Sequence, residues 1–497
     1  MYSRLYIFVI INLFGFAGSS YSQVNNTDST DIKMSYDLGE VTIKPIKKES
    51  SADYISTQTI NNYNQQDIAG ALQTLSGLNY MAIGSKNEAM VTIRGFDLRQ
   101  VPVYLDGVPV YTIYDGYVDL SRFTSFDIAG ITVKNGNSSV LYGPNTMGGV
   151  INLVTRAPDK PFSFDGATGI RLSRDGFNAW NTNLNLGGRI GKFYIMGTVS
   201  TLNKDYFSLS QKFVPTLQEN GGKRDNSFSK DSKLSFKAGF KPNKTDDYAI
   251  SVMSQKASKG VPVYTGMDPN QKSRYWQFPD YNKKGIYFSS RTKLGSQSYL
   301  KTRLYYDNYY SDLRSYDDST YTTQDLRSSF TSIYDDNTFG ASLEYQISLN
   351  EKHILQAAGY YKYDQHKEYN VHPTIETPRN MIDFITSIGL EDKYKINEKF
   401  DLEAGLSYQY LGNIRADDYN APNDSLYSFP DNNKGGINAR LQLEYSINPT
   451  QTLQLGAARK VRFATMKNRY SYRYGRSIPN PFLLPESALN FDLNYSG

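Results

Sequence analysis

Apolar and polar residues alternate with a period of two over most of the chain after Phe162. Segments such as 233–240 (KLSFKAGF), 401–410 (DLEAGLSYQY) and 440–447 (RLQLEYSI) direct every second side chain to the same face, which is typical of β-strands. Short turns and long polar loops connect these segments alternately. Counting two strands for each hairpin predicts about 14 antiparallel strands.

The two kinds of connection differ clearly in length. The short turns lie at 188–192, 242–246, 295–297, 349–352, 397–399 and 448–451. The long loops are rich in Asp, Asn, Ser, Tyr and Pro, and they lie at 203–230, 258–283, 311–336 and 415–434. This asymmetry is typical of an outer-membrane barrel, which has short periplasmic turns and long extracellular loops.

The residues before Phe162 predict a compact unit of short elements. In 68–78 (IAGALQTLSGL), apolar residues recur at helical spacing and a glycine near the end supplies a stop. Residues 91–110 (VTIRGFDLRQVPVYLDGVPV) predict two strands around a polar turn. A further turn is predicted at Asp106 and Gly107.

The stretch 131–158 (ITVKNGNSSVLYGPNTMGGVINLVTRAP) joins a glycine-rich centre to an apolar, β-branched run. Gly143, Gly148 and Gly149 permit positive φ angles or close backbone approach, and 150–155 predicts a strand. A phosphate-binding loop would need Gly-Lys-Ser/Thr entering a helix, whereas these glycines lead into a strand without that lysine. Nucleotide binding is therefore disfavoured.

Three sequence blocks, in order, resemble the plug domain of TonB-dependent outer-membrane receptors. The blocks are IRGF at 93–96, VYLDGVP at 103–109, and LYG followed by GGVINLVT at 141–155. The resemblance implies a mainly β protein, with a small α/β plug domain inside a large antiparallel transmembrane β-barrel. Such barrels have about 22 strands, so about 14 of the expected 22 are present. The chain lacks the terminal aromatic residue of such barrels, and we expect a C-terminally incomplete receptor.

The first residues of the chain predict its location. Arg4 precedes the apolar run 5–16, and Ser20 and Ser22 follow at positions suited to cleavage. The run is too short to span a bilayer, so we predict an export signal and residence in the outer membrane of a Gram-negative cell. The predicted segments are a signal peptide at 1–22, a flexible N-terminus at 23–36, the TonB box and plug domain at 37–158, and the incomplete barrel at 159–497.

Composition agrees with a barrel wall and narrows the choice of partners. The chain has 42 Tyr, 25 Phe, 2 Trp and no Cys, and the aromatic residues suit the girdles of a barrel. A soluble β-sandwich or propeller remains open on composition alone. The net charge of +5, spread over 54 basic and 49 acidic residues, is too diffuse to favour nucleic acid. Without cysteine, disulfides and thiolate metal sites are excluded.

A short alternating segment near the N-terminus is a candidate for energy coupling. Within DLGEVTIK at 37–44, the residues Glu40, Val41, Thr42 and Ile43 are the TonB-box candidate that the resemblance implies. Such a peptide would add an edge strand to TonB, which works with its inner-membrane energising complex. The alternative is that this segment is simply the first strand of the next domain.

The resemblance also implies an arginine latch between plug and barrel. Arg94 is the candidate latch residue, although it could equally be a surface arginine. Where the family commonly has Arg-Gly-Pro, this chain has Asn135, Gly136 and Asn137. A buried charge pair that lacks one partner is costly, so we expect a latch that is partial or built differently.

We predict ligand contacts on the plug and in one barrel loop. Aromatic faces and a guanidinium suit a planar, anionic metal chelate, such as a ferric siderophore of the catecholate type or a citrate complex. The alternative for each residue is ordinary packing. The candidates are Ser85, Lys86, Asn87, Tyr111, Tyr114 and Tyr117 on the plug, and Tyr264, Arg274, Tyr275 and Trp276 in the loop.

The predicted function is TonB-dependent import of a scarce iron chelate, with outer-membrane lipid around the barrel. Cobalamin, haem or oligosaccharide cargo remains open, as does a passive porin or adhesin. We predict no cofactor and no enzymatic activity, because no catalytic motif such as G-x-S-x-G or H-E-x-x-H is present. His353, His366 and His372 are predicted to be ordinary surface histidines and not metal ligands.

Overall fold

A computed structural model describes residues 34–37, 40–43, 52–83, 86–266, 268, 270–472 and 477–497. Strands β1 (Met34–Asp37) and β2 (Glu40–Ile43) pair with each other. Nearly all of the predicted signal peptide and flexible N-terminus lies outside the described residues. The rest of the description concerns residues 52–497.

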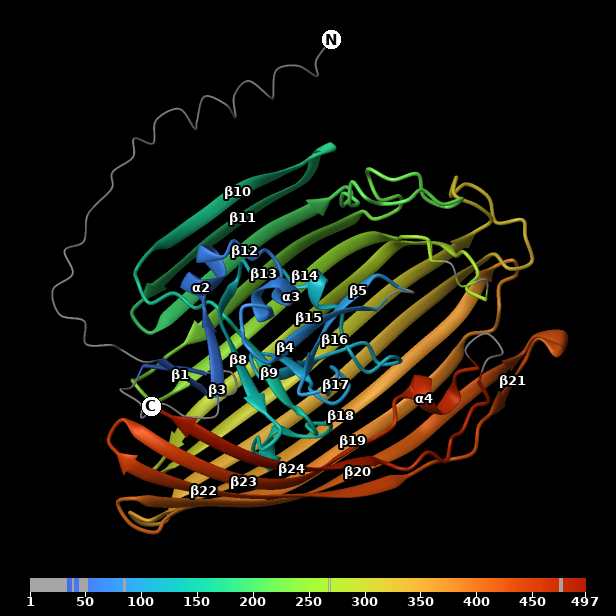
Figure 1. Cartoon of the computed structure of the whole chain (residues 1–497). Coiled ribbons are helices and arrows are strands. Elements are labelled where there is room, and N and C mark those ends of the chain that lie inside the picture. Colours follow the sequence, from blue (N-terminus) through green and yellow to red (C-terminus); the bar gives the residue numbers. More distant parts are fainter. Residues whose placement is uncertain are drawn as a thin grey trace, which may run out of the picture. The chain divides into compact units, whose positions relative to one another are not determined.

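The wall is one antiparallel sheet in which 14 strands pair in the order β10–β20, β22, β23, β24, while β21 (Ser425–Ser428) pairs with β20 (Figure 1). The predicted count of about 14 strands is confirmed. The bounds are β10 Ser163–Ser173, β11 Gly176–Ile190, β12 Phe193–Lys204, β13 Ser229–Phe240, β14 Asp247–Val261, β15 Tyr275–Leu294, β16 Ser298–Tyr316, β17 Phe330–Ser348, β18 His353–His372, β19 Arg379–Lys395, β20 Phe400–Asn420, β22 Lys434–Asn448, β23 Gln451–Arg462 and β24 Glu486–Ser496.

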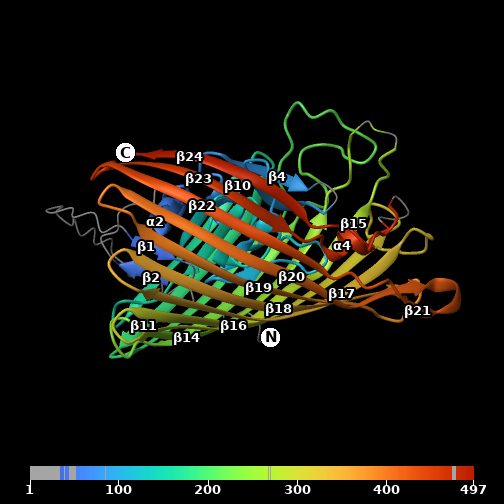
Figure 2. The same ribbon diagram turned by 90° about the horizontal axis from the view of Figure 1, so that it is seen from below.

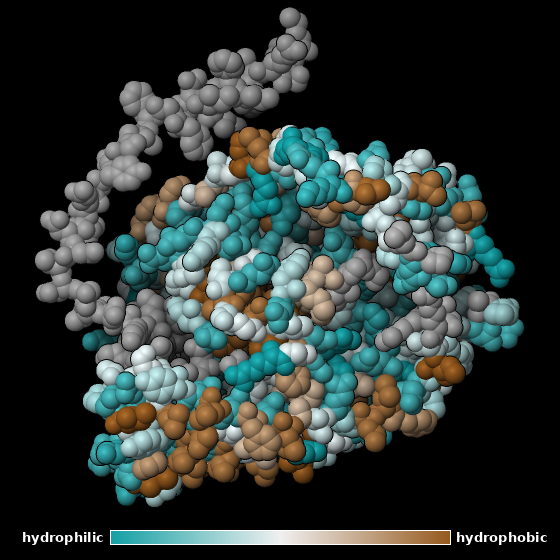
Figure 3. All heavy atoms as spheres, in the orientation of Figure 1, coloured by the Kyte–Doolittle hydropathy of each residue, from teal (hydrophilic) through white to brown (hydrophobic). Residues whose placement is uncertain are grey.

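The two faces of the wall explain why the sequence alternates. In β13, Leu234 and Phe236 point away from the plug and are about half exposed. Lys233 of the same strand, which lies between β12 and β14, is buried on the inner face. Apolar side chains form a band over β22, β23 and β24 in Figure 3. The period of two therefore separates an apolar outer face from a polar inner face.

The connections agree with the predicted asymmetry, and their lengths need one correction. All six predicted short turns are present, and they gather at one end of the wall, with the long connections at the other end (Figures 1 and 2). The predicted loop 258–283 is too long, because β14 continues to Val261 and β15 begins at Tyr275. The other three predicted loops are also shorter in the structure. Aromatic and polar residues form these strand ends, so the aliphatic alternation that marks a strand is missing there.

The plug is a small α/β unit beside the inner face of the wall. Its main sheet has the order β3-β8-β9-β6-β7, and β4 and β5 form a separate hairpin. Ile131, Ile151 and Leu153 are fully buried in its core. The bounds are β3 Ala52–Ser56, α2 Thr57–Asn62, α3 Ile68–Leu72, β4 Leu78–Ile83, β5 Glu88–Ile93, β6 Val103–Leu105, β7 Val108–Val110, η1 Leu120–Arg122, β8 Ile128–Asn135, η2 Val140–Tyr142 and β9 Gly149–Thr155.

The plug elements confirm several local predictions and shorten others. The helix predicted over 68–78 spans only α3, whose N-terminus is capped by the Asp67 side chain accepting from the Gly70 amide at 2.9 Å. Residues 91–110 contain parts of three strands, β5, β6 and β7, rather than two. The turn at Asp106 and Gly107 is confirmed, with φ angles of 51° and 79°.

The glycine-rich centre behaves as predicted. Gly143 and Gly149 have φ angles of 89° and 131°, which an L-residue adopts at a cost. A Cβ atom on Gly148 would lie 2.4 Å from the Cβ of Phe96, so this glycine permits a close approach. The predicted strand at 150–155 is present as β9.

Two short helical elements lie in the wall region, where only strands were predicted. They are η3 (Ala421–Asn423) and α4 (Met466–Tyr470). The α4 sequence MKNRY has no apolar period, so periodicity could not have found it. Among the described residues, no helix is both long enough and apolar enough to cross a membrane.

Candidate ligand vestibule and plug–wall interface

A cavity of about 910 Å³ lies between the plug and the wall near the long connections; we call it the vestibule. Its volume falls within the range of small-molecule sites. Its lining includes four acidic side chains, those of Asp115, Asp336, Glu368 and Asp418. It also includes six basic side chains, a formal excess of two in the lining, although Arg99 and Arg379 pair with Asp97 and Glu376 just outside it. The six basic residues are Lys86, Arg99, Arg274, Arg327, Arg379 and Lys467.

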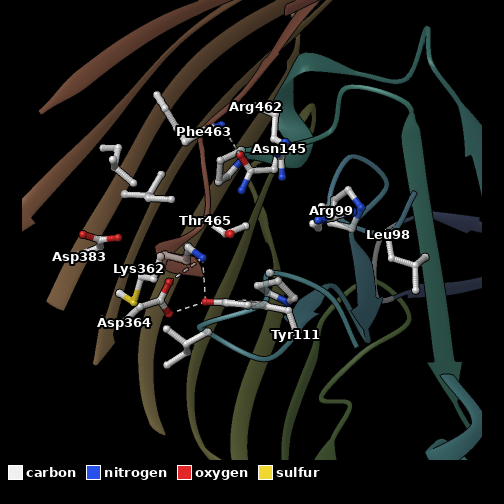
Figure 4. A pocket seen from close by; sticks show the side chains of 18 of the residues that line it. Leu98, Arg99, Tyr111, Asn145, Lys362, Asp364, Asp383, Arg462, Phe463 and Thr465 are labelled. Atoms are coloured by element: carbon white, nitrogen blue, oxygen red, sulfur yellow. Dashed lines mark hydrogen bonds and ion pairs between the residues drawn. The ribbon is translucent and has the colours of Figure 1, made fainter. Parts of the chain in front are cut away.

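Plug residues 111–117, the apex loop, reach the wall and the vestibule. The Tyr111 hydroxyl donates to Asp364 and accepts from Lys362 Nζ at 2.7 Å (Figure 4). Burial, and next the charge of Asp364, raise the pKa of Tyr111 far above its ordinary value. Tyr111 lines a separate cavity of about 70 Å³ and not the vestibule. It joins plug to wall.

Tyr114 lines the vestibule and stacks on His366 of β18, with ring centroids 4.7 Å apart. The His366 ring lies 2.6 Å from Asp336 and 3.5 Å from Glu368. The prediction of a surface histidine is wrong for His366, which is 0% exposed. Its position on the inner face of an unusually long strand places it against the plug.

His353 and His372 are partly exposed, as predicted for histidines near the ends of a strand. His353 pairs with Asp392 at 2.8 Å, and His372 contacts the backbone oxygen of Gln324 at 2.6 Å. Within the part of the chain that the structure describes, no three His, Asp or Glu side chains are grouped to hold a metal ion.

Asp115 lies at the centre of a charge cluster in the vestibule lining. Its carboxylate accepts from Lys86 Nζ at 2.7 Å and from Lys467 Nζ at 2.5 Å. Burial alone would raise the pKa of Asp115, but the charges of Lys86 and Lys467 outweigh burial and hold that pKa well below its usual range. Burial would lower the pKa of Lys86, and the charge of Asp115 raises it above its usual value instead. The three groups together carry one positive charge.

Tyr117 also lines the vestibule, and its hydroxyl donates to Glu88 at 2.7 Å. Tyr281 of β15 donates to the other oxygen of Glu88 at 3.1 Å. Burial, and next the charge of Glu88, raise the pKa of Tyr117 strongly. This plug tyrosine is therefore a fixed hydrogen-bond donor at neutral pH.

Of the four ligand contacts predicted in the barrel loop, only two line the vestibule. Arg274 and Trp276 line the vestibule, and the guanidinium lies 4.8 Å from the Trp276 ring centroid. Tyr275 between them does not line the vestibule, because β15 begins there and side chains alternate. It packs edge-on against Tyr321, at 6.1 Å between centroids. Tyr264 is 42% exposed and lies outside the lining.

The remaining predicted ligand contacts lie at the β4–β5 turn. Ser85 is outside the described residues. Asn87 has a φ angle of 49°, as suits a turn, and does not line the vestibule, whereas Lys86 does. Sequence reasoning missed four basic residues of the lining, Arg99, Arg327, Arg379 and Lys467. Arginines and lysines are common throughout the chain, so only the fold distinguishes these four.

On one side, the plug is held by wall lysines, in what we call the lysine flank. Four plug aspartates each accept from one lysine of β12, β13 or β14. The pairs are Lys204–Asp67 at 2.8 Å, Lys233–Asp127 at 2.7 Å, Lys237–Asp106 at 2.8 Å and Lys259–Asp119 at 2.9 Å. In addition, the Arg122 guanidinium lies 3.7 Å from the Tyr281 ring centroid. No sequence motif indicated these pairs.

On the other side, the plug meets β19, β22 and β24, in what we call the carboxylate flank. Arg94 forms an ion pair with Asp492 of β24. Arg440 Nε of the wall donates to the Asn137 backbone oxygen at 2.8 Å, and Ser139 donates to Glu391 at 3.0 Å. Where the family commonly has a second plug arginine, this chain therefore has a wall arginine that contacts plug backbone. The contact of Arg94 is compatible with a latch, and its role stays a prediction.

The TonB-box candidate Glu40, Val41, Thr42 and Ile43 coincides with strand β2. Its pairing with β1 shows that this segment adopts extended backbone. Extended backbone is what strand addition to a partner requires.

Comparison with known proteins supports the same architecture. Residues 44–150 match the profile of the TonB-dependent receptor plug domain. The vitamin B12 transporter BtuB of Photobacterium profundum is 27% identical over 113 residues, which are 22% of this chain and 19% of that protein. BtuB of Vibrio vulnificus is 25% identical over 134 residues, 27% of this chain and 22% of that protein. The matched region thus spans about a fifth of these relatives.

Solved structures share the fold of the whole described region. The copper transporter OprC superposes with a TM-score of 0.73 at 13% identity, covering 90% of this chain and 70% of OprC. The ferric citrate transporter FecA, in its unliganded form, gives 0.69 at 16% identity, covering 90% of this chain and 67% of FecA. A plug domain beside a large antiparallel wall defines the class. The plug-domain match over residues 44–150 and the shared fold are consistent with a TonB-dependent receptor.

Proposed function

We propose that this chain is the plug-bearing part of an outer-membrane transporter that imports an anionic metal chelate of the ferric siderophore type. The observation that carries the proposal is the vestibule, with its excess of basic side chains beside a plug that pairs with the wall on two flanks. A cargo held there would contact both plug and wall, as a receptor that signals through its plug requires.

The lining chemistry supports an anionic, aromatic or planar cargo. The guanidiniums of Arg274 and Arg327 can donate pairs of hydrogen bonds to oxygen anions, whereas Arg379 already pairs with Glu368 and Glu376. Trp276 and Tyr117 offer ring faces for planar groups. Catecholate and citrate complexes of iron have both properties, since each presents several anionic oxygens on a compact surface.

The apolar outer face of the wall and the predicted signal peptide at 1–22 support residence in the outer membrane. TonB, with its inner-membrane energising complex, is the proposed energy source. The extended backbone of Glu40–Ile43 supports its role as the TonB box.

Deletion of Glu40–Ile43 in cells tests the proposal. Energised uptake of ferric citrate or a ferric tris-catecholate should be abolished, because the coupling strand is absent, whereas surface binding of the same chelate should be unchanged. Uptake is measured with radioactive iron, with and without a protonophore. Uptake that survives the deletion and is insensitive to the protonophore would reject energised import and favour a passive porin.

Cobalamin is the second candidate cargo, because two similar curated proteins are named vitamin B12 transporters. Cyanocobalamin carries no net charge, so it would make little use of the basic lining. Competition between cyanocobalamin and ferric tris-catecholate for the binding of whole cells decides between the two cargo classes.

A further inference from the structure

The connection from β23 to β24 folds inward and contacts the plug. We call residues 463–472 the strap, and α4 lies within it. The Lys467 amide donates to the Tyr114 backbone oxygen at 3.1 Å. A Cβ atom on Gly116 would lie 2.4 Å from Thr465 Cγ2, so the strap and the apex loop are in tight contact. A segment of the wall therefore rests directly on the plug.

The strap is also fixed to the wall. Arg469, whose side chain is 1% exposed, forms an ion pair with Asp383 of β19. Met466 packs in a buried cluster with Ile113 of the apex loop and Met381 of β19. Thr465 and Asn468 form a capping box that holds the first turn of α4. Within one turn of helix, Lys467 reaches the plug and Arg469 reaches the wall.

The charge cluster at the strap has two cations and one anion, so it can accept a further anion. Lys86 and Lys467 share the single carboxylate of Asp115, and all three line the vestibule. If Lys467 turned to another anion, Asp115 would keep Lys86 as its partner and would not be left as an unpaired buried charge. Removing Lys467 from this cluster therefore costs less free energy than removing the only cationic partner of a buried carboxylate.

We propose that Lys467 exchanges partners when cargo binds: an anionic oxygen of the chelate takes Lys467 from Asp115, and this frees the apex loop from the strap. The proposal rests on the proposed function, and it assigns to the strap the step by which an occupied vestibule loosens the plug. Lys86 stays with Asp115 throughout. The cargo feature that is recognised is an exposed oxygen anion, as in catecholate or citrate complexes.

A single-cysteine reporter tests the proposal in the full chain, which has no cysteine of its own. Met466 is 2% exposed, so the cysteine of a Met466→Cys variant should react slowly with a maleimide while the strap is seated. Thr320→Cys, on an exposed loop, gives the reference rate for an accessible thiol.

The first arm needs no cargo. Adding Lys467→Gln to the reporter should raise the labelling rate by about tenfold, because a hydrogen bond between charged groups is lost. Lys467→Arg should leave the rate near that of the reporter alone, since the charge is kept. Lys272→Gln, which changes an exposed lysine outside the vestibule lining, is the matched control and should have no effect. Equal rates for Lys467→Gln and Lys272→Gln would overturn the proposal.

The second arm adds ferric citrate, a ferric tris-catecholate or uncharged cyanocobalamin at saturating concentration. Binding is measured separately by equilibrium dialysis. A bound anionic chelate should raise the labelling rate several-fold. A chelate that binds without changing the rate would overturn the strap proposal and leave the proposed function standing. Binding of cyanocobalamin with no binding of either chelate would contradict both, because the cargo would then have no net negative charge and would not be a metal chelate with several exposed oxygen anions.

Discussion

The plug meets the wall on two flanks, which differ in the charge of the plug groups that contact the wall. On the lysine flank, plug aspartates pair with wall lysines, so both partners carry charge. On the carboxylate flank, Glu391 accepts from the neutral donor Ser139, and Arg440 donates to the Asn137 backbone oxygen. Separation on the lysine flank leaves four plug carboxylates without their lysine partners. Separation on the carboxylate flank leaves mostly neutral plug groups, apart from the half-exposed Arg94. The lysine flank should therefore resist separation more strongly.

The carboxylate flank has only one of the two plug arginines that the resemblance implies for a latch. The family's second arginine is replaced by the sequence Asn135, Gly136 and Asn137, and the wall supplies Arg440 at that place instead. Arg440 also pairs with Glu391 at 3.2 Å and with Glu403 at 2.6 Å. An arginine is therefore present at this place in the interface, but it is Arg440 of the wall and not a plug residue.

The largest expected effect is that of Lys233→Met on the lysine flank. The side chains of Lys233 and Asp127 are 2% and 6% exposed, so the substitution leaves Asp127 buried without its cation. We expect a loss of about 3–5 kcal/mol in the free energy that holds the plug in its folded, wall-bound state. The measurement is the urea midpoint at which the plug becomes sensitive to protease.

Two further variants control this prediction. Lys212→Met changes an exposed loop lysine and should leave the midpoint unchanged. Lys233→Met combined with Asp127→Leu should recover part of the loss, because no unpaired charge then remains. A midpoint for Lys233→Met that matches Lys212→Met would show that the lysine flank does not hold the plug.

A smaller effect is expected for Arg94→Ala on the carboxylate flank. The Arg94 side chain is 47% exposed, so water screens the cation, although its partner Asp492 is only 3% exposed. We expect a loss of about 1–2 kcal/mol in the same urea and protease assay, because water that already reaches Arg94 can solvate Asp492 once the arginine is truncated. A loss equal to that of Lys233→Met would contradict the ranking of the two flanks and would make Arg94 a dominant latch.

The smallest effect is expected for Ser139→Ala, which removes the hydrogen bond to Glu391 at 3.0 Å and the one that the Ser139 hydroxyl accepts from the Leu141 amide at 3.1 Å. Glu391 keeps its partner Arg440, so the loss should be about 0.5–1 kcal/mol. Hydrogen exchange of residues 136–142, measured by mass spectrometry, locates the change. Exchange that rises across β8 and β9 as well would show that this contact supports the whole plug.

Much of the fold follows from the sequence, because it depends on local rules. Alternation fixed the strands, and residues such as Gly295 and Asn397 marked turns that the structure confirms. Strand ends made of aromatic and polar residues, as at Tyr275, were missed, because they lack the aliphatic alternation by which the other strands were predicted. The five-residue α4 was missed because one helical turn contains no periodicity.

The candidate site follows from the sequence only in part. Five of the predicted ligand contacts, Lys86, Tyr114, Tyr117, Arg274 and Trp276, line the vestibule together. Their contact with a ligand stays a prediction, as do the TonB box and the latch. The pairs of the lysine flank join residues up to 140 positions apart, as in Lys259–Asp119, and the buried His366 depends on strand register. Such contacts arise from the fold and have no local signal.

The most direct test of the central claim, an anionic chelate in the vestibule, uses the two tryptophans of the chain. In a Trp180→Phe variant, Trp276 is the remaining tryptophan, and it lines the vestibule. Titration with a ferric tris-catecholate should quench its fluorescence saturably, and Arg274→Gln should weaken the apparent affinity by about tenfold. Quenching by cyanocobalamin with none by either ferric tris-catecholate or ferric citrate would contradict the account.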